Sequence, residues 1–251
     1  MLTEERFGAI LQELKLHGAV TVTDLAEKLG ISESTVRRDL QSLDARGLLK
    51  KVHGGATAAD TAGFQSDEAD VSTKSALNVA EKEKIARYAA SFISDDDFVY
   101  LDAGTTTEKM IAYLDSSVRA SFVTNGIVHA KKLIQKGLRA YIIGGQVKLS
   151  TEAVIGAVAV NNLKQYNFTK AFMGANGITV AQGFTTPDTE EGLLKAEAVN
   201  RSYMTYVLAD SSKFNKVFSV TFAPIEKACI LTDSLPDGDY QEHTVVREVT
   251  E

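Results

Sequence analysis

The sequence predicts an α/β protein of two domains: a small N-terminal winged helix-turn-helix and a larger C-terminal domain around a largely parallel sheet. Three helical patterns and an alternating, hairpin-like stretch occupy residues 1–57. Residues 58–75 are rich in Gly, Ala, Ser, Thr and Asp without a sustained apolar period, which is typical of a linker. From residue 76 to residue 251, helical patterns alternate with apolar strand patterns, as they do in α/β sheets.

Composition limits the class of protein. The chain has 251 residues, of which 44% are hydrophobic, and a formal net charge of -6. No apolar run approaches the roughly 18 residues of a membrane-spanning helix, and the acidic start lacks the apolar stretch of a secretory signal. The single cysteine, Cys229, lies in an apolar run, so we expect a buried side chain in a reducing interior. These features predict a cytoplasmic protein without a membrane partner.

The N-terminal helices are predicted from apolar spacing and from capping residues. Apolar residues recur at helical spacing between residues 4 and 18. Thr23 is expected to cap a second helix over residues 24–30, and Ser32 a third helix that ends at Gly47. The third helix has one apolar face, formed by Val36, Leu40 and Leu43. The following stretch LLKKVHGGA alternates like a small hairpin, or wing.

The other face of the third helix and the wing carry the residues that we expect to contact DNA: Ser32, Ser34, Thr35, Arg37, Arg38, Gln41, Lys50, Lys51 and His53. Arginine can form paired hydrogen bonds with guanine, hydroxyls can reach phosphates, and lysines neutralise phosphates. Residues 33–57 hold five Lys/Arg and three Asp/Glu in an otherwise acidic chain. The alternative is a solvated helix face whose arginines pair with Asp39 and Asp44.

The C-terminal domain is predicted to alternate helices and strands. Helices are expected over residues 82–93, 108–114, 127–137, 154–166 and 190–202. Apolar strands are expected over residues 97–102, 120–124, 139–145, 170–175, 204–210 and 227–233. Right-handed crossovers would bring the carboxyl ends of parallel strands to one rim, where ligands bind in such sheets.

Small polar residues follow four of these strands: Asp102, Gly104, Thr105, Thr106 and Thr107, then Asn125, then Gly144 and Gly145, then Asn176. A glycine-threonine turn leading into a helix is typical of a phosphate cradle, because backbone N–H groups and hydroxyls donate to the anion. Taken alone, such a turn is more often an ordinary helix cap. Four such ends on one rim favour a site for a small anionic ligand. The sequence lacks a Walker loop and a GxGxxG after a strand, so no nucleotide cofactor is indicated.

Residues 21–56, TVTDLAEKLGISESTVRRDLQSLDARGLLKKVHGGA, resemble the DNA-binding segment of the DeoR family of bacterial sugar-metabolism regulators. The segments DAGTT, IGG, GANG, TPDTEEGLLK and LADSSKF resemble the effector domain of the same family. This resemblance implies operator DNA as a partner, assembly into a dimer or tetramer, and a sensor domain similar in fold to ribose-5-phosphate isomerase that responds to phosphorylated sugars. The closest impression is of fructose and lactose/tagatose operon repressors, which implies fructose 1-phosphate first and tagatose 6-phosphate second as effector.

The resemblance also implies roles for single residues. Asp102, Gly104, Thr105 and Thr106 would hold the phosphate or nearby hydroxyls, Lys195 and Lys213 would supply cations, and Asn125, Gly145 and Asn176 would line the sugar. For Lys195 the alternative is a surface lysine paired with Glu191 on the same helix. The sequence departs from the family in two places. Asp95–Asp97 replaces the usual Asp-Gly-Asp turn, and no arginine follows Phe64 closely.

Two other classes of function compete with a sugar-responsive repressor. A sugar-phosphate isomerase could use Asp188, Glu190, Glu191 and Lys195, but the Lys-Gly-Gly-Gly loop of such isomerases is absent, so we interpret these acids as a helix N-terminus and expect no enzyme. A DNA-binding protein without a ligand would not respond to sugar phosphates. No metal site is expected, since the four histidines are scattered and no HExxH motif occurs.

Overall fold

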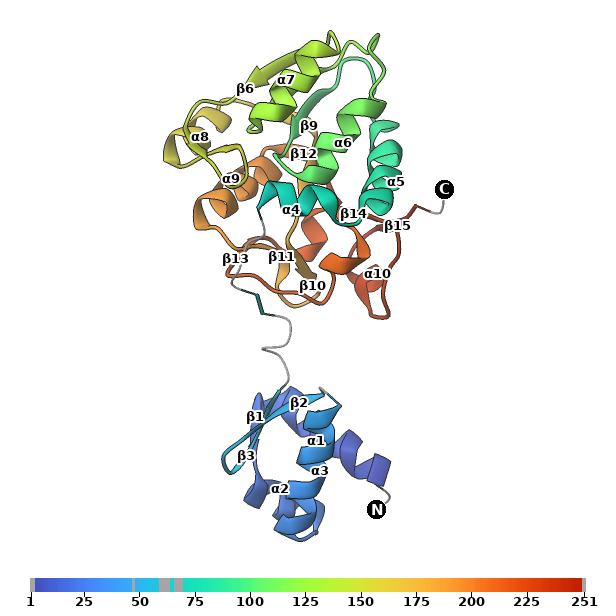
Figure 1. The fold of residues 1–251 in the computed structure, drawn as a ribbon, viewed down its shortest axis with the longest axis vertical. Coiled ribbons are helices and arrows are strands. Elements are labelled where there is room, and N and C mark those ends of the chain that lie inside the picture. The colour runs from blue at the N-terminus through green and yellow to red at the C-terminus, as the bar shows by residue number, and fades with distance from the viewer. Residues whose placement is uncertain (1–2, 47, 59–63, 66–69, 250–251) are drawn as a thin grey trace. The chain divides into compact units, whose positions relative to one another are not determined.

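The computed structural model describes residues 3–46, 48–58, 64–65 and 70–249. The chain forms two compact units, Met1–Phe64 and Gln65–Glu251. In the described residues, none of the helices has the length and apolar character needed to cross a membrane. The predicted fold class, a winged helix-turn-helix followed by a parallel α/β sheet, is confirmed (Figure 1).

The N-terminal unit contains three helices and a small sheet: α1 (Thr3–His17), β1 (Ala19–Thr21), α2 (Val22–Leu29), α3 (Glu33–Ala45), β2 (Leu49–Val52) and β3 (Gly55–Ala58). The sheet has the order β1-β3-β2, and β2 and β3 form the predicted wing. The strand β1 was not predicted. At Gly55 the wing passes so close to β1 that a Cβ would lie 2.0 Å from the Val20 carbonyl oxygen, which explains the glycine.

The capping prediction is right for α3 and wrong for α2. Ser32 caps α3, its Oγ accepting a hydrogen bond from the Thr35 N–H at 3.3 Å. Thr21 rather than Thr23 caps α2, because the helix begins at Val22, whose side chain is buried. Gly47, predicted to end the third helix, lies outside the described residues, and α3 ends at Ala45. The predicted apolar faces of α1 and α3 meet in one core under the wing.

The C-terminal unit is built on a seven-stranded parallel sheet. Its strands are β4 (Phe98–Leu101), β5 (Ser121–Thr124), β6 (Arg139–Ile142), β9 (Phe168–Gly174), β12 (Ser202–Leu208), β14 (Cys229–Thr232) and β15 (Val246–Glu248). One face packs on α5 (Val79–Ala90), α6 (Thr105–Tyr113) and α7 (Ile127–Gln135), the other on α8 (Ala157–Leu163) and α9 (Thr189–Asn200). Buried apolar side chains on both faces explain why these strands are nearly continuous apolar runs.

Several elements of this unit were not predicted from the sequence. A hairpin joins β7 (Gln146–Lys148) to β8 (Ala153–Ile155), and the end of β8 occupies the start of the predicted helix 154–166, so that α8 begins only at Ala157. A second sheet of order β10-β11-β13 consists of β10 (Gly177–Thr179), β11 (Gly183–Thr186) and β13 (Val220–Ala223). The remaining elements are short helices: η1 (Ser211–Lys213), η2 (Ile225–Lys227) and α10 (Tyr240–His243). Strands of three or four residues are too short to give a clear period.

Part of the predicted linker is helical. Within residues 58–75, the helix α4 (Val71–Ala76) begins after Asp70, whose carboxylate accepts a hydrogen bond from the Thr73 N–H at 2.8 Å. None of the α4 residues is buried, so the helix has no apolar period that the sequence could reveal. Polar contacts hold it instead: the Val71 N–H donates to the Ser150 carbonyl at 3.0 Å, and Lys82 donates to the Lys74 carbonyl.

The order of the strands places a ligand site at one point of the sheet. The sheet runs β15-β14-β12-β9-β4-β5-β6, so the chain builds outward from β4 in one direction and then from β9 in the other. Beyond the carboxyl ends of β4 and β9 the connections diverge, and a crevice forms at such a switch point.

At the amino end of β4, Asp96 adopts the left-handed conformation, φ 68°, that glycine would take in the family's usual turn.

Candidate DNA-binding face and effector pocket

The exposed face of α3 collects the residues that were predicted to contact DNA. Arg37, Arg38 and Gln41 are exposed together, and their spacing with Ser34 puts all four on one face of the helix. At its N-terminus, the Ser32 hydroxyl lies 2.9 Å from both the Ser34 and the Thr35 hydroxyl. This face therefore presents two guanidinium groups and an amide behind a cluster of hydroxyls, at the end of the helix that attracts phosphate.

The arginines do not make the ion pairs of the alternative interpretation. Asp39 is buried and binds Arg6 of α1 at 2.8 Å, and Asp44 accepts the backbone N–H of Lys51 at 3.0 Å. Arg37 instead pairs with Glu33 at 2.8 Å, in an exposed pair one turn earlier. Exposed pairs of this kind contribute less than about 1 kcal/mol, so Arg37 can exchange Glu33 for another partner.

The wing adds the other predicted cations. Lys50 and Lys51 are exposed on β2, and His53 is exposed at the turn. Gly54 has φ 83°, the left-handed conformation that a tight hairpin turn requires. The Gly54 carbonyl accepts the Val22 N–H at 2.8 Å, which fixes the wing to the start of α2.

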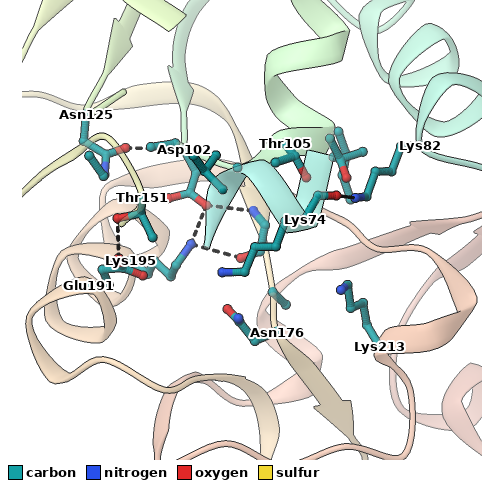
Figure 2. A pocket seen from close by; sticks show the side chains of 18 residues that line it. Lys74, Lys82, Asp102, Thr105, Asn125, Thr151, Asn176, Glu191, Lys195 and Lys213 are labelled. Atoms are coloured by element: carbon teal, nitrogen blue, oxygen red, sulfur yellow. Dashed lines mark hydrogen bonds and ion pairs between the residues drawn. The ribbon is translucent and has the colours of Figure 1, made fainter. Parts of the chain in front are cut away.

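A pocket opens in the C-terminal unit at the switch point between β4 and β9 (Figure 2). It encloses about 770 Å³ of space, including the part open to solvent. Eight predicted effector residues line it: Asp102, Gly104, Thr105, Thr106, Asn125, Asn176, Lys195 and Lys213. They come from β4, α6, β5, β9, α9 and η1, or from residues adjoining them, so the fold brings together residues far apart in sequence.

The turn from β4 into α6 is built around Thr107. The buried Thr107 hydroxyl lies 2.5 Å from the Asp102 carbonyl and 2.7 Å from the Gly104 carbonyl, and accepts the Gly104 N–H at 3.0 Å. Thr107 therefore stabilises the turn and does not line the pocket, contrary to the prediction. Its neighbours Thr105 and Thr106 do line the pocket, and as the first residues of α6 their N–H groups have no acceptor within the helix.

Gly144 and Gly145, also predicted, do not line the pocket. They follow β6, which is an edge strand two places from β4 in the sheet. A Cβ at Gly145 would lie 2.8 Å from the Ile155 carbonyl oxygen, so this glycine lets the chain pack against β8. The Gly144 N–H donates to the Asn162 side chain at 3.2 Å. Gly145 therefore has a packing role that the sequence alone does not distinguish from ligand binding, whereas a Cβ at Gly144 would meet no atom within 4 Å.

Lys195 is buried and pairs with Asp102 at the wall of the pocket, not with Glu191 as the alternative proposed. Its ammonium also donates to the Gly174 carbonyl at 3.1 Å and lies 5.6 Å from the centre of the Phe222 ring. The same carboxylate oxygen of Asp102 accepts the Gly174 N–H at 2.9 Å. Asp102 and Lys195 thus connect the ends of β4 and β9 to α9.

Lys82 and Lys213 line the side of the pocket opposite Lys195 and Glu191 (Figure 2). Lys82 of α5 lines the pocket and is only 2% exposed. Lys74 of α4 also lines the pocket, and neither lysine was predicted from the sequence. Desolvation by burial lowers the pKa of Lys82 and of Lys213, and the nearby Asp210 carboxylate partly opposes this. No sequence signal marked Lys82, because a lysine on an amphipathic helix is normally solvated. Lys74 was missed because its helix was taken for linker.

Two more residues of the pocket were not predicted as ligand contacts. Thr151 follows the β7 strand, and Glu191 lies in the first turn of α9, whose N-cap is Asp188 as the acidic pattern indicated.

The two predicted asparagines of the pocket differ in their partners. The Asn125 side chain is hydrogen-bonded within the protein: its Oδ1 accepts the Tyr100 hydroxyl and the Ala103 N–H, and its Nδ2 donates to the Val154 carbonyl. Among the described residues, the Asn176 side chain has one hydrogen-bond partner, the Thr186 hydroxyl, which donates to its Oδ1 at 3.2 Å.

The described residues hold no cluster of three His, Cys, Asp or Glu side chains suited to a metal ion. His129 is buried against the Thr107 hydroxyl at 3.2 Å and the Gly104 carbonyl at 3.1 Å, so it supports the turn into α6. Burial lowers the pKa of His129. Cys229 is half-buried, and burial raises the pKa of its thiol.

Comparison with known proteins agrees with this division of the chain. A profile described as the DeoR-like helix-turn-helix domain matches residues 6–62, and one described as the DeoR C terminal sensor domain matches residues 77–234. The uncharacterized HTH-type transcriptional regulator FruR of Bacillus subtilis is 43% identical over 252 residues, 99% of each chain. The lactose phosphotransferase system repressor of Staphylococcus epidermidis is 32% identical over 234 residues, 92% of each chain.

Among solved structures, ribose 5-phosphate isomerase A of Methanocaldococcus jannaschii aligns over 55% of both chains, with 16% identity and a TM-score of 0.42. The profiles cover both units of the chain, and the sensor profile alone matches more than half of it. The chain belongs to the DeoR family, with a DeoR-like helix-turn-helix domain followed by a DeoR C-terminal sensor domain.

Proposed function

We propose that the protein is a cytoplasmic transcriptional repressor of a sugar uptake or catabolic operon, and that a phosphorylated sugar controls its binding to the operator. The observation that carries this proposal is the pocket at the β4–β9 switch point, where a helix N-terminus and several lysines converge on one cavity. The family membership and the names of the relatives, which include a lactose phosphotransferase system repressor, support it.

The operator would be bound by α3 and the wing. Arg37, Arg38 and Gln41 would contact base edges in the major groove, with the hydroxyls at the start of α3 on the adjoining phosphates. Lys50, Lys51 and His53 would neutralise phosphates beside the groove. The regulator would act as a dimer or tetramer, since two copies of such a helix recognise two half-sites one helical turn apart.

The phosphate of the effector would lie at the N-terminus of α6. The N–H groups of Thr105 and Thr106 and the Thr105 hydroxyl can donate to it, and the helix dipole favours an anion there. Lys82 and Lys213 would supply the compensating positive charge from the same side of the pocket. A lysine whose pKa is lowered by desolvation is stabilised in its charged form by a bound phosphate, so the pocket is suited to this ligand.

Helix α4 would connect the pocket to the DNA-binding unit. It is the first helix after residues 59–69, and its Lys74 lines the pocket while its last turn is held by Lys82. A phosphate that draws Lys74 and Lys82 toward itself would change the position of α4. A ligand shifts such an equilibrium only through its different affinity for the two arrangements, typically by about 1–3 kcal/mol.

Fructose 1-phosphate is the first candidate effector and tagatose 6-phosphate the second. The experiment that tests the proposed function is a thermal-shift screen against a panel of sugar phosphates, followed by operator-release assays with each ligand that stabilises the protein. We expect one phosphorylated sugar both to raise Tm and to weaken operator binding. A protein that binds its operator but is stabilised by none of them is a DNA-binding protein without this kind of effector.

An enzymatic role has weaker support. Asp188 caps α9, and Glu191 is bound to Lys148 and Thr151, so these acids have structural partners. We therefore propose that the pocket binds its ligand without turnover. Incubation of the protein with pentose and hexose phosphates should leave them unchanged, and isomerised product would contradict this proposal.

Thr105→Val is expected to leave operator binding intact and to abolish its release by the ligand. No described residue hydrogen-bonds to the Thr105 hydroxyl, which lines the pocket, so its loss should affect the ligand rather than the fold. A lost hydrogen bond to a charged group costs about 1.5–3 kcal/mol, or roughly 10–150-fold in affinity. Thermal shift and operator release measure both effects, with Thr189→Val, exposed at the start of α9, as the control.

Ligand affinity should also depend on pH in a way that reports the protonation of Lys82 and Lys213. Affinity should rise toward neutral pH as the phosphate loses its second proton, near a pKa of about 6. It should then fall at alkaline pH, because Lys82 and Lys213 have lowered pKa values and lose their protons earlier than an exposed lysine does. Calorimetry across this range measures the change, and constant affinity on the alkaline side would remove both lysines from the phosphate site.

A further inference from the structure

The two carboxylates among the described residues that line the pocket, Asp102 and Glu191, both lie on one side of it, each paired with a lysine. Figure 2 shows Lys82 and Lys213 on one side and Asp102, Glu191 and Lys195 on the opposite side. A sugar phosphate whose phosphate lies beside Lys82 would place its far end beside the two carboxylates. The ligand groups that can donate hydrogen bonds to these carboxylates therefore determine which sugar phosphates can bind.

Glu191 holds one carboxylate oxygen in place with protein donors and leaves the other free. Its Oε1 accepts Lys148 Nζ at 3.0 Å and the Thr151 hydroxyl at 2.9 Å. Its N–H donates to Asp188 at 2.9 Å, so the start of α9 is fixed as well. No described residue donates to Oε2, although Glu191 is buried and lines the pocket. The carboxylate is thus oriented before any ligand arrives.

Asp102 has the same arrangement. Its Oδ2 accepts both the Gly174 N–H and the Lys195 ammonium, while Oδ1 has no donor among the described residues. Neither this oxygen nor Oε2 of Glu191 is sealed from solvent, since the only fully buried, unpartnered side-chain oxygen in the described part of the chain belongs to Asp210. Two acceptor atoms on the same side of one pocket therefore remain for a ligand.

An ionised carboxylate only accepts hydrogen bonds. Hydroxyl groups satisfy it, whereas a second phosphate or a carboxylate would meet the two free carboxylate oxygens with no proton to donate, and its charge would oppose theirs even though Lys148 and Lys195 neutralise part of it. We infer that Glu191, with Asp102, selects a sugar monophosphate with free hydroxyls at the end away from its phosphate, and excludes ligands with a second anionic group there. This inference rests on the proposed function, because it concerns the same pocket.

Glu191→Gln tests the inference with little change of shape. We expect the wild-type protein to bind fructose 1-phosphate at least about tenfold more tightly than fructose 1,6-bisphosphate, as one repulsive charge can produce. In Glu191→Gln this ratio should fall several-fold, because the amide removes the negative charge and adds a donor. Glu190→Gln is the matched control: it removes the same charge from the neighbouring, exposed position of α9 and should leave the ratio unchanged.

A second measurement needs no variant. If repulsion causes the discrimination, the ratio for the wild-type protein should decrease as salt screens the charges, on the scale set by a Debye length of about 8 Å at physiological ionic strength. An unchanged ratio in Glu191→Gln, or equal binding of the two sugars by the wild type, overturns this inference and leaves the proposed function standing. Failure of the wild type to bind any sugar phosphate overturns the proposed function and this inference together.

Discussion

Arg37→Ala is expected to abolish operator binding at physiological salt while leaving the stabilisation by ligand unchanged. Arg37 is exposed on α3 beside Arg38, and its only partner in the described chain is Glu33, in an exposed pair. Loss of a paired contact to guanine costs about 1–3 kcal/mol at each half-site, and a dimer loses it twice. Since the side chain supports no buried contact, the fold and the sensor unit should not change.

Fluorescence anisotropy with labelled operator DNA, across several salt concentrations, measures the loss. Arg119→Ala is the matched control, because Arg119 is also exposed and paired with an acid, Asp95, but belongs to the sensor unit. It should bind the operator as the wild type does. Normal operator binding by Arg37→Ala would remove this residue from the recognition face.

Lys195→Met is expected to cause the largest loss of stability among these variants and also to abolish the response to ligand. Lys195 and Asp102 form a buried ion pair whose other hydrogen bonds go to Gly174. Removing one member leaves a buried carboxylate without its cation, which costs about 3–5 kcal/mol of the free energy of unfolding. Chemical denaturation in urea measures this cost.

The double variant Asp102→Asn with Lys195→Met separates the two possible causes. If the uncompensated charge causes the loss, neutralising Asp102 should restore much of the stability, because a buried pair can often be replaced at little cost. Lys164→Met, exposed after α8, should have little effect. A loss in Lys195→Met no greater than in Lys164→Met would contradict a structural role for the pair.

Much of the candidate site could be predicted because its residues follow strands. Asp102, Asn125 and Asn176 are close in space since parallel strands end at one rim, and strand ends are visible in sequence. The same argument failed for Gly144 and Gly145, because it does not say where β6 lies in the sheet. That strand is at the edge, and Gly145, which follows it, packs against β8.

Lys74, Lys82 and Glu191 could not be found in this way. Each lies on a helix, where a charged residue normally faces solvent, and only the packing of that helix decides whether it faces a cavity instead. Lys82 and Lys195 are both buried, yet the sequence around them does not differ from that of an exposed amphipathic helix. The helix α4 was hidden for a related reason, since it buries no side chain and so has no apolar period.

By itself, the sequence determined the winged helix-turn-helix, the alternation of helices and strands, the face of α3 that carries Arg37 and Arg38, and the turn into α6. Each depends on residues within a few positions of one another, so local spacing and capping are sufficient. Only the tertiary structure decided that Asp102 pairs with Lys195, that Lys82 is buried, and that Glu191 faces Lys82 and Lys213 across the pocket. These relations join residues distant in the chain, and the order of strands and the packing of helices bring them together.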